Sequence, residues 1–139
     1  MFSSDGRWLA YGSFESGRSE VYVRRFPGPG GKWQISTDGG TFPTWSRTRP
    51  ELFYASPDNH LMVASYSVEG DSFKADKPRV WSPRRFMSRL GRPFDLHPDG
   101  DRFALAAAPE NEAAVKQDNL VFIFNFFDEL RRIAPAARR

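Results

Sequence analysis

Cysteine is absent from the 139-residue chain. Its absence excludes disulfide bonds, a thiol nucleophile and any zinc or iron–sulfur site with cysteine ligands. Long hydrophobic runs are also absent, because the longest run of large apolar residues, 120–124, has five residues, whereas a membrane-spanning helix needs about 20. The first residues lack the basic and apolar regions of a signal peptide. The sequence therefore predicts no membrane segment in this chain and leaves its compartment open.

The excess of basic over acidic residues is also small. Lys and Arg total 20 against 17 Asp and Glu, so the net charge is +3. Sixteen of the basic residues are Arg, whose guanidinium groups suit phosphates, but acidic residues are interleaved with them along most of the chain. This pattern favours a solvated surface of mixed charge. Aromatic residues, at 15%, and turn formers, with 11 Gly and 11 Pro, are abundant, which predicts a globular chain with many turns.

Three segments of the sequence resemble one another: residues 2–11, 45–54 and 96–105. Each has a large apolar residue, two spacers, a turn and then an apolar strand. Aligning Asp5, Thr48 and Asp99 gives spacings of 43 and 51 residues. A repeat of about 40 to 50 residues that contains strands is typical of the blades of a β-propeller.

The turns inside these repeats have a local physical cause. In Asp5-Gly6 and Asp99-Gly100, the Asp side chain can bond the backbone two residues on, and Gly tolerates a positive φ. Each pair therefore reverses the chain between two strands. The second repeat has Thr48-Arg49 followed by Pro50, and since Pro fixes φ and lacks an N–H group, this turn must differ in geometry.

The remaining sequence predicts an all-β fold made of four-stranded antiparallel propeller blades. The blades span about 1–40, 41–91 and 92–127, so the chain forms about three blades of a partial propeller, and a short helix follows at 128–134. Several strands are apolar on both faces, as residues 61–63 are, which is expected where a sheet is packed between two neighbours. Turn clusters lie at 15–18, 27–31, 56–59 and 69–72. Strands are predicted at 8–14, 20–26, 33–36, 42–46, 51–55, 61–67, 79–81, 93–96, 102–107 and 120–126.

The repeat residues resemble the TolB-like, WD-repeat-like β-propeller family of bacteria. The resemblance lies in residues 2–11, 45–47, 51–54 and 98–100, and in the linking stretch 19–36. It is closest to the propellers that follow a serine/threonine kinase domain in some soil bacteria, whose last blade ends much like residues 125–130. The resemblance implies a binding or sensing platform rather than an enzyme, in a periplasmic or other extracytoplasmic location. No kinase motif is present in the chain.

Motifs for catalysis, a cofactor or a metal are not evident in the sequence. There is no Gly-x-Ser-x-Gly nucleophile motif, and His60 and His97 fall in predicted turns. Gly28-Pro29-Gly30-Gly31-Lys32 precedes a predicted strand rather than a helix, so we interpret it as an inter-strand loop and not a phosphate loop. Asp95, Asp99 and Asp101 offer oxygen ligands for calcium, but their spacing is not that of an EF-hand and Asp99 is explained by its turn. We therefore predict no catalytic, cofactor or metal residues.

One segment, residues 83–92, carries four Arg and no acidic residue. It connects the second predicted blade to the third, and a loop held by a rigid scaffold is a common place for function. Its Arg84, Arg85, Arg89 and Arg92 could bind a phosphate, a nucleic-acid backbone or an acidic protein. The alternative interpretation is a solvated connection that is held in place by its apolar residues.

These observations leave three functions open. The first is a non-enzymatic propeller segment that binds a protein or small ligand at its loops, and that is the C-terminal part of a larger protein. The second is an accessory propeller of an enzyme, either the sensor of a kinase or the cap of a prolyl-oligopeptidase-like peptidase. The third is self-association through exposed blade edges, because closed propellers have about four to eight blades. The sequence has no recognition helix or RNA-binding signature, so we expect no nucleic-acid partner.

Overall fold

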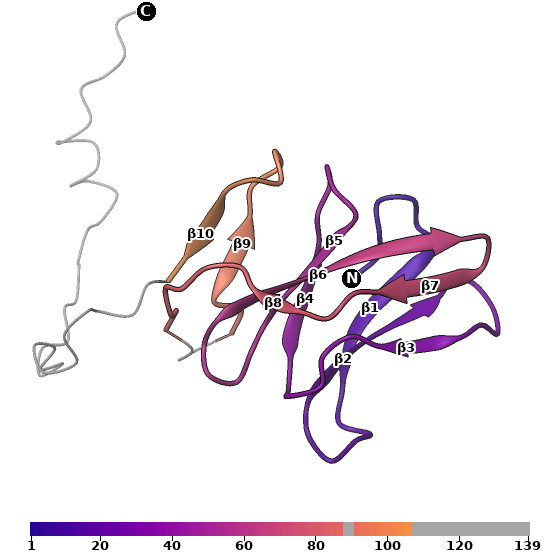
Figure 1. Ribbon diagram of the computed structural model, residues 1–139, viewed down its shortest axis with the longest axis horizontal. Helices are drawn as coiled ribbons and strands as arrows, with labels where there is room; N and C mark the ends of the chain where they lie inside the picture. Colours follow the sequence, from indigo (N-terminus) through magenta and orange to yellow (C-terminus); the bar gives the residue numbers. More distant parts are fainter. Residues whose placement is uncertain (88–90, 107–139) are drawn as a thin grey trace, which may run out of the picture. The chain divides into compact units, whose positions relative to one another are not determined.

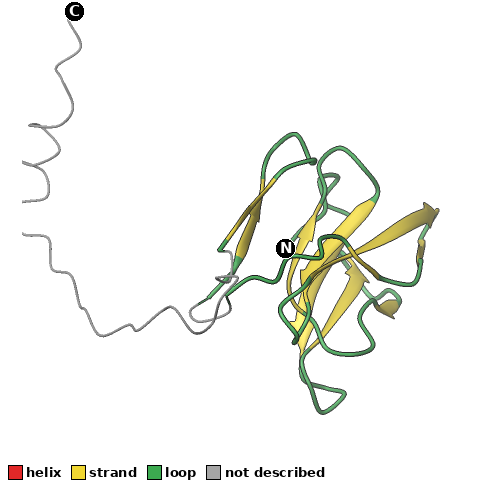
Figure 2. Ribbon diagram, turned by 60° about the vertical axis from the view of Figure 1, so that its left-hand side comes forward, coloured by secondary structure: helices red, strands yellow, loops and turns green. Residues whose placement is uncertain are grey.

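Short runs of β-branched and aromatic residues form strands, and Gly- and Pro-rich segments form the turns between them. The computed structural model describes residues 1–87 and 91–106, which belong to one compact unit, Met1–Ala108 (Figure 1). This part of the chain has only strands and loops (Figure 2). The strands are β1 (Trp8–Ser13), β2 (Glu20–Arg25), β3 (Lys32–Gln34), β4 (Thr41–Trp45), β5 (Glu51–Ala55), β6 (Leu61–Glu69), β7 (Ser72–Ala75), β8 (Arg79–Val80), β9 (Phe94–Leu96) and β10 (Phe103–Leu105).

All of the pairings between these strands are antiparallel, so the predicted all-β antiparallel class is confirmed. Each strand predicted within the described residues overlaps an observed strand. The strand predicted at 120–126 and the helix predicted at 128–134 lie outside the described residues. The described sheets do not close into a ring.

The strands form three sheets rather than a series of four-stranded ones. The first sheet has the order β1-β2-β3, and the third contains β9 and β10. The middle sheet has five strands, in the order β4-β5-β6-β7, with β8 also paired to β6. Strand β6 accommodates both partners because Met62 and Val63 pair with β8, whereas residues 66–69 pair with β7.

The turn cluster predicted at 69–72 is shorter in the structure. Strand β6 continues to Glu69, which pairs directly with Ser72, the first residue of β7. The chain therefore reverses over Gly70 and Asp71 alone, and Gly70 has the positive φ of 58° that such a tight hairpin needs. Strand β7 was missed because Phe73 is its only large apolar residue.

The three sequence repeats form the same backbone arrangement. Strands β4 and β5 form one hairpin, strands β9 and β10 form another, and Phe2 makes an isolated bridge to Leu9 of β1. In each repeat, the residue before the turn donates its N–H to the carbonyl at the start of the next strand. These bonds are 2.9 Å long for Ser3 to Trp8, Ser46 to Glu51 and His97 to Arg102.

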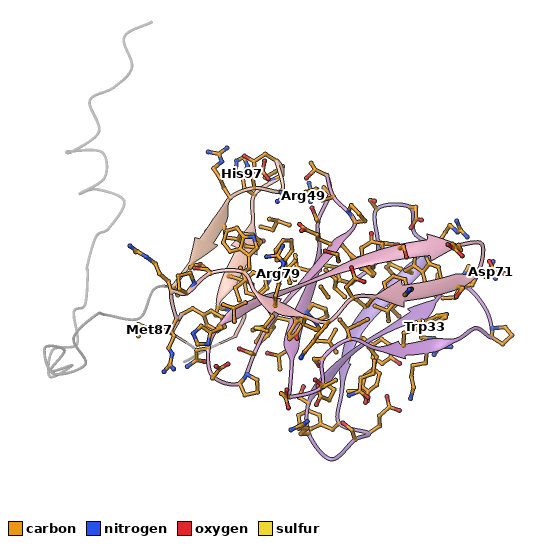
Figure 3. The ribbon with its side chains drawn as sticks, in the orientation of Figure 1. Trp33, Arg49, Asp71, Arg79, Met87 and His97 are labelled. Carbon is orange, nitrogen blue, oxygen red and sulfur yellow. The ribbon has the colours of Figure 1, made fainter. Side chains whose placement is uncertain are left out.

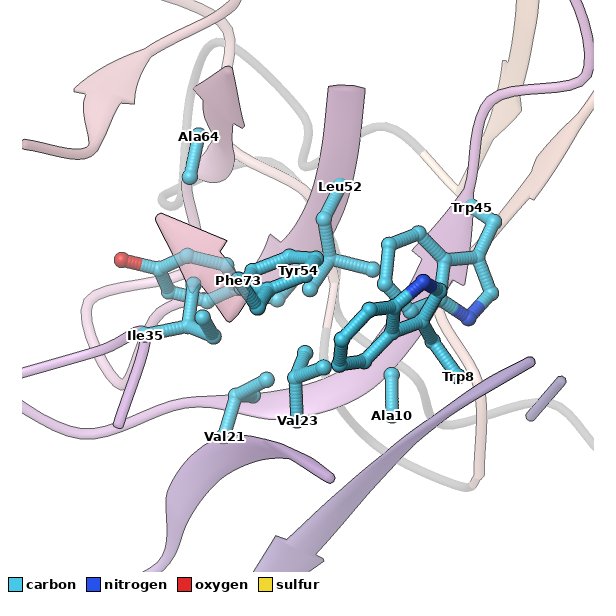
Figure 4. Packing of buried hydrophobic residues seen from close by; sticks show 10 residues of the cluster. All are labelled: Trp8, Ala10, Val21, Val23, Ile35, Trp45, Leu52, Tyr54, Ala64 and Phe73. Carbon is cyan, nitrogen blue, oxygen red and sulfur yellow. The ribbon is translucent and has the colours of Figure 1, made fainter. Parts of the chain in front are cut away.

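The apolar core forms two clusters, one on each face of the middle sheet. Along β5, Leu52 and Tyr54 belong to the cluster shared with the first sheet, whereas Phe53 and Ala55 belong to the cluster shared with the third. Two-sided burial, which residues 61–63 predicted, thus extends over β5 and the first half of β6. Figure 4 shows the first cluster: Trp8, Ala10, Val21, Val23, Ile35, Trp45, Leu52, Tyr54, Ala64 and Phe73.

Candidate functional site

The first part of the Arg-rich segment is an exposed loop that is held in place by the buried side chain of Phe86. Arg84 and Arg85 are exposed and make no ion pair with another described residue. The next residue, Phe86, is 1% exposed in the second cluster, and its N–H donates to the Asn59 carbonyl at 3.0 Å. Met87, labelled in Figure 3, donates its N–H to Ala106 at 2.6 Å. The apolar anchor therefore presents two free guanidinium groups to solvent.

Arg92 differs from these two arginines because its side chain already has partners. Its guanidinium donates to the Thr44 hydroxyl on β4 and, through Nε, to the Phe94 carbonyl at 3.0 Å. The same group lies 5.4 Å from the centre of the Phe94 ring. Arg89 lies outside the described residues. The structure thus keeps Arg84 and Arg85 accessible and uses Arg92 to join β4 to β9.

The Asp-Gly turns are stabilised by the local hydrogen bonds that the sequence predicts, from backbone N–H groups to the Asp carboxylate. The Asp5 carboxylate accepts the Ser3 hydroxyl at 2.5 Å and the Arg7 N–H at 3.0 Å, and Gly6 has a φ of 69°. Hydrogen bonding from Ser3 is the main reason that the pKa of Asp5 lies below its usual value. These side chains act within their own turn.

The Asp99-Gly100 turn is built in the same way and also contacts its neighbour. The Asp99 carboxylate accepts the Asp101 N–H at 3.0 Å, which holds its pKa far below the usual range, and Gly100 has a φ of 77°. Arg49, labelled in Figure 3, donates to the Gly100 carbonyl at 3.0 Å and pairs with Asp101 at 2.8 Å. The turns of the second and third repeats are therefore joined.

The three carboxylates that we considered for calcium are directed to separate partners. Asp95 accepts the Leu96 N–H at 3.0 Å, Asp101 pairs with Arg49, and Asp99 serves its own turn. Within the described ranges, no three metal-ligating side chains gather at one point.

The histidines lie in turns, as the sequence predicted, each with an Asp two residues away. His60 Nδ1 is 2.8 Å from Asp58, and His97 Nδ1 is 2.9 Å from Asp99. Ser56 completes a Ser, Asp and His set with Asp58 and His60, but its hydroxyl donates to Asp58 rather than to the imidazole. A nucleophilic serine needs the imidazole as its base, so these contacts stabilise a turn and do not form a catalytic triad.

A cavity of about 320 Å³ lies at one end of the first and middle sheets. We call it the Tyr54 cavity. Its floor is a row of cross-strand neighbours, because Tyr54 on β5 pairs with Met62 on β6, which pairs with Val80 on β8. Its walls are the turns 37–39 and 56–58 and the segment 77–78.

Tyr54 is the one core tyrosine whose side chain lines this cavity. The residue is 3% exposed, its ring packs in the first cluster, and its hydroxyl lies at the edge of that cluster in Figure 4. The hydroxyl has no hydrogen-bond partner among the described residues. Burial, together with the charges of Glu20 and Asp38, raises the pKa of Tyr54 to about 12. It is therefore a protonated hydroxyl at neutral pH.

The wall at 37–40 is fixed by a carboxylate with no exposed surface. Glu20 accepts hydrogen bonds from the Ser36 hydroxyl, from Arg18 Nε at 2.6 Å and from the Gly39 N–H at 3.0 Å. Burial alone would raise the pKa of Glu20, but these hydrogen bonds outweigh it and lower the pKa below its usual value. Gly39 has a φ of 93°, and a Cβ atom there would overlap the Pro57 ring, so only glycine fits this close approach.

A second cavity, of about 280 Å³, shares Gly39, Ser56 and Pro57 with the Tyr54 cavity. It is also lined by Arg18 and by Phe86, the anchor of the Arg84–Arg85 loop. Gly39 lies at the link between the first and second predicted blades, and Phe86 lies at the link between the second and third. These two links therefore meet beside the 56–59 turn.

Sequence reasoning identified the arginine loop but missed both cavities and Glu20. A signal was present in the pair Gly39-Gly40, which follows a predicted strand and marks a close approach of backbone. Nothing in the sequence shows that Tyr54, Met62 and Val80 become neighbours, because that depends on the register of three strands.

Comparison with known proteins adds no further assignment: no family model, curated protein or solved structure matches the chain. The residues that the structure describes contain no helix that could cross a membrane.

Proposed function

We propose that the chain is a non-enzymatic β-propeller segment that recognises a protein or small ligand through loops at one end of its sheets. The equivalent turn hydrogen bonds of the three repeats and the face-to-face packing of successive sheets support the propeller part of this proposal. The observation that supports the recognition part is the meeting of Gly39, Pro57 and Phe86 around two adjoining cavities. Concave sites between loops on a rigid scaffold are common binding sites.

The loop that begins with Arg84 and Arg85 gives this end of the molecule its recognition chemistry. Both guanidinium groups are free of ion pairs with described residues, and Phe86 fixes the backbone beside them. An acidic segment of a partner protein would gain charge-assisted hydrogen bonds there without first breaking an internal ion pair. We therefore expect an acidic protein segment as the partner.

The test measures binding of a fluorescent oligoglutamate peptide by anisotropy at low ionic strength. The double variant Arg84→Ser with Arg85→Ser should bind about tenfold more weakly. The matched control replaces Arg24 and Arg47, which are exposed and make no ion pair within the described residues, by Ser. It loses the same charge and should bind like the wild type. Equal weakening in both variants, or no binding by the wild type, would contradict the proposed site.

A further inference from the structure

The Tyr54 cavity is separate from the loop of Arg84 and Arg85, since neither arginine lines it. Its floor is apolar over most of its length. Adjacent strands are about 4.8 Å apart, so the row from Tyr54 through Met62 to Val80 spans roughly 10 Å. That length and the volume of about 320 Å³ suit a small molecule with a short apolar body.

The charges around this floor are unevenly placed. Asp38 and Asp58 both line the cavity, Asp38 in the turn that precedes β4 and Asp58 in the turn that follows β5. Lys77 lies in the segment that leads into β8 and Val80, the other end of the row. The end of the cavity at Tyr54 is thus lined by two carboxylates.

The two carboxylates differ in their partners, because each Asp58 oxygen already has one in its own turn, the Ser56 hydroxyl or His60 Nδ1, whereas Asp38 projects into solvent. The Asp38 side chain is 98% exposed and its only ion-pair partner among the described residues, Arg18, is 3.8 Å away. Hydrogen bonds from Ser56 and then His60 lower the pKa of Asp58, so this group is ionised at neutral pH. Both carboxylates therefore carry negative charge at the rim.

The Tyr54 hydroxyl supplies an independent indication of a ligand. The Tyr54 residue is 3% exposed, and its hydroxyl has no hydrogen-bond partner among the described residues. It lines a cavity rather than solid core. Its oxygen can accept an N–H group that enters from the cavity.

We propose that the Tyr54 cavity binds a small organic cation of the guanidinium or alkylammonium class. The cationic head would lie between Asp38 and Asp58 and donate to the Tyr54 hydroxyl, and its apolar body would lie along Met62 toward Val80. This inference rests on the proposed function and deepens it, because it assigns a small-molecule ligand to one of the two cavities, which none of the arginines of the loop lines.

The test uses the full chain labelled with ¹³C in its methionine methyl groups and titrated with butylguanidinium, a guanidinium with an alkyl body. The Met62 methyl signal should shift and reach saturation, whereas the Met87 signal, outside the cavity, should not. Butylurea, which has a similar shape but no charge, should bind at least about tenfold more weakly. No saturable Met62 shift up to butylguanidinium concentrations on the order of 20 mM, or equal binding of both probes, would overturn the proposal.

Three variants then locate the site. Tyr54→Phe retains the ring and Asp38→Asn changes a side chain that is 98% exposed, and each should weaken butylguanidinium binding about five- to tenfold. The control Glu69→Gln removes one exposed charge at the opposite end of β6 and should bind like the wild type. Unchanged binding by Asp38→Asn and Tyr54→Phe would overturn the assignment. Since Asp38 makes no core contact, its variant decides the question even if Tyr54→Phe disturbs folding.

Discussion

Glu20 is a charged residue with no solvent exposure, and its environment explains how the fold tolerates it. Taking a carboxylate out of water is costly unless hydrogen bonds replace the lost water. Here a hydroxyl, a guanidinium and a backbone N–H supply those bonds. One side chain thereby connects the β1–β2 loop to the link between the first and middle sheets.

Replacing Glu20 by Gln should destabilise the fold by about 2 kcal/mol at neutral pH, because charged hydrogen bonds become neutral ones. The pKa of Glu20 is lower in the folded than in the unfolded chain, where it is near 4.5. Its stabilising effect is therefore complete above that value and is lost as the pH falls through the lower folded pKa. Urea denaturation should show that the difference between wild type and variant shrinks as the pH is lowered below 4.5.

The control for this experiment is Glu69→Gln, which alters an exposed glutamate that has no ion pair within the described part of the chain. It should change the free energy of unfolding by less than about 0.5 kcal/mol at either pH. A Glu20→Gln variant whose deficit is the same at acid and neutral pH would contradict the assignment.

At the scale of elements, most strands were predictable because their apolar residues alternate or run continuously between clear turns. Strand β7 was not predictable, since only one of its side chains, Phe73, is buried in the apolar core. Phe73 contacts four aromatic rings, with ring centres 5.0 Å away for Tyr66 and 5.2 Å away for Trp8. The rings come from four other strands, and their meeting around Phe73 depends on how those strands pack, so sequence alone does not reveal the importance of β7.

Truncating this residue tests the importance of the short strand. Phe73→Ala should lower the free energy of unfolding by about 3–5 kcal/mol, because it removes a buried ring and leaves a cavity. Chemical denaturation measures the loss. Phe14→Ala is the matched control, since Phe14 is 75% exposed and its removal should cost less than about 0.5 kcal/mol. A small effect of Phe73→Ala would mean that β7 does not hold the first cluster together.

The site was less predictable than the strands. The four arginines stood out because they are adjacent in sequence, yet the structure gives Arg92 a structural partner in Thr44. The lining of the Tyr54 cavity comes from turns and strands far apart in the sequence. Composition and local pattern identify a run of charge, but a cavity depends on strand register and on how turns pack.

At the scale of the whole described unit, the middle sheet belongs to both apolar clusters. Adjacent residues of β5, such as Phe53 and Tyr54, face opposite clusters. A loss of packing on one face therefore affects the strand that supports the other. We expect the three sheets to unfold together.

Tryptophan fluorescence can test this coupling. A Trp81→Phe background leaves Trp8, Trp33 and Trp45, which all report on the first cluster. Adding Phe53→Leu alters only the second cluster and should destabilise it by about 1 kcal/mol. Fluorescence should follow that shift and coincide with the transition seen by circular dichroism. An unchanged fluorescence midpoint would show that the two clusters melt independently.

The two-sided middle sheet also has a consequence during synthesis on the ribosome. Its face toward the third sheet, with Phe53 and Val63, is complete long before Phe94 and Phe103 emerge to cover it. At about 5–20 residues per second, the roughly 40 residues between Val63 and Phe103 take about 2–8 s to make. During that interval the apolar face of the middle sheet is exposed on the nascent chain. We therefore expect this stretch to be bound by the chaperones that act on emerging polypeptides.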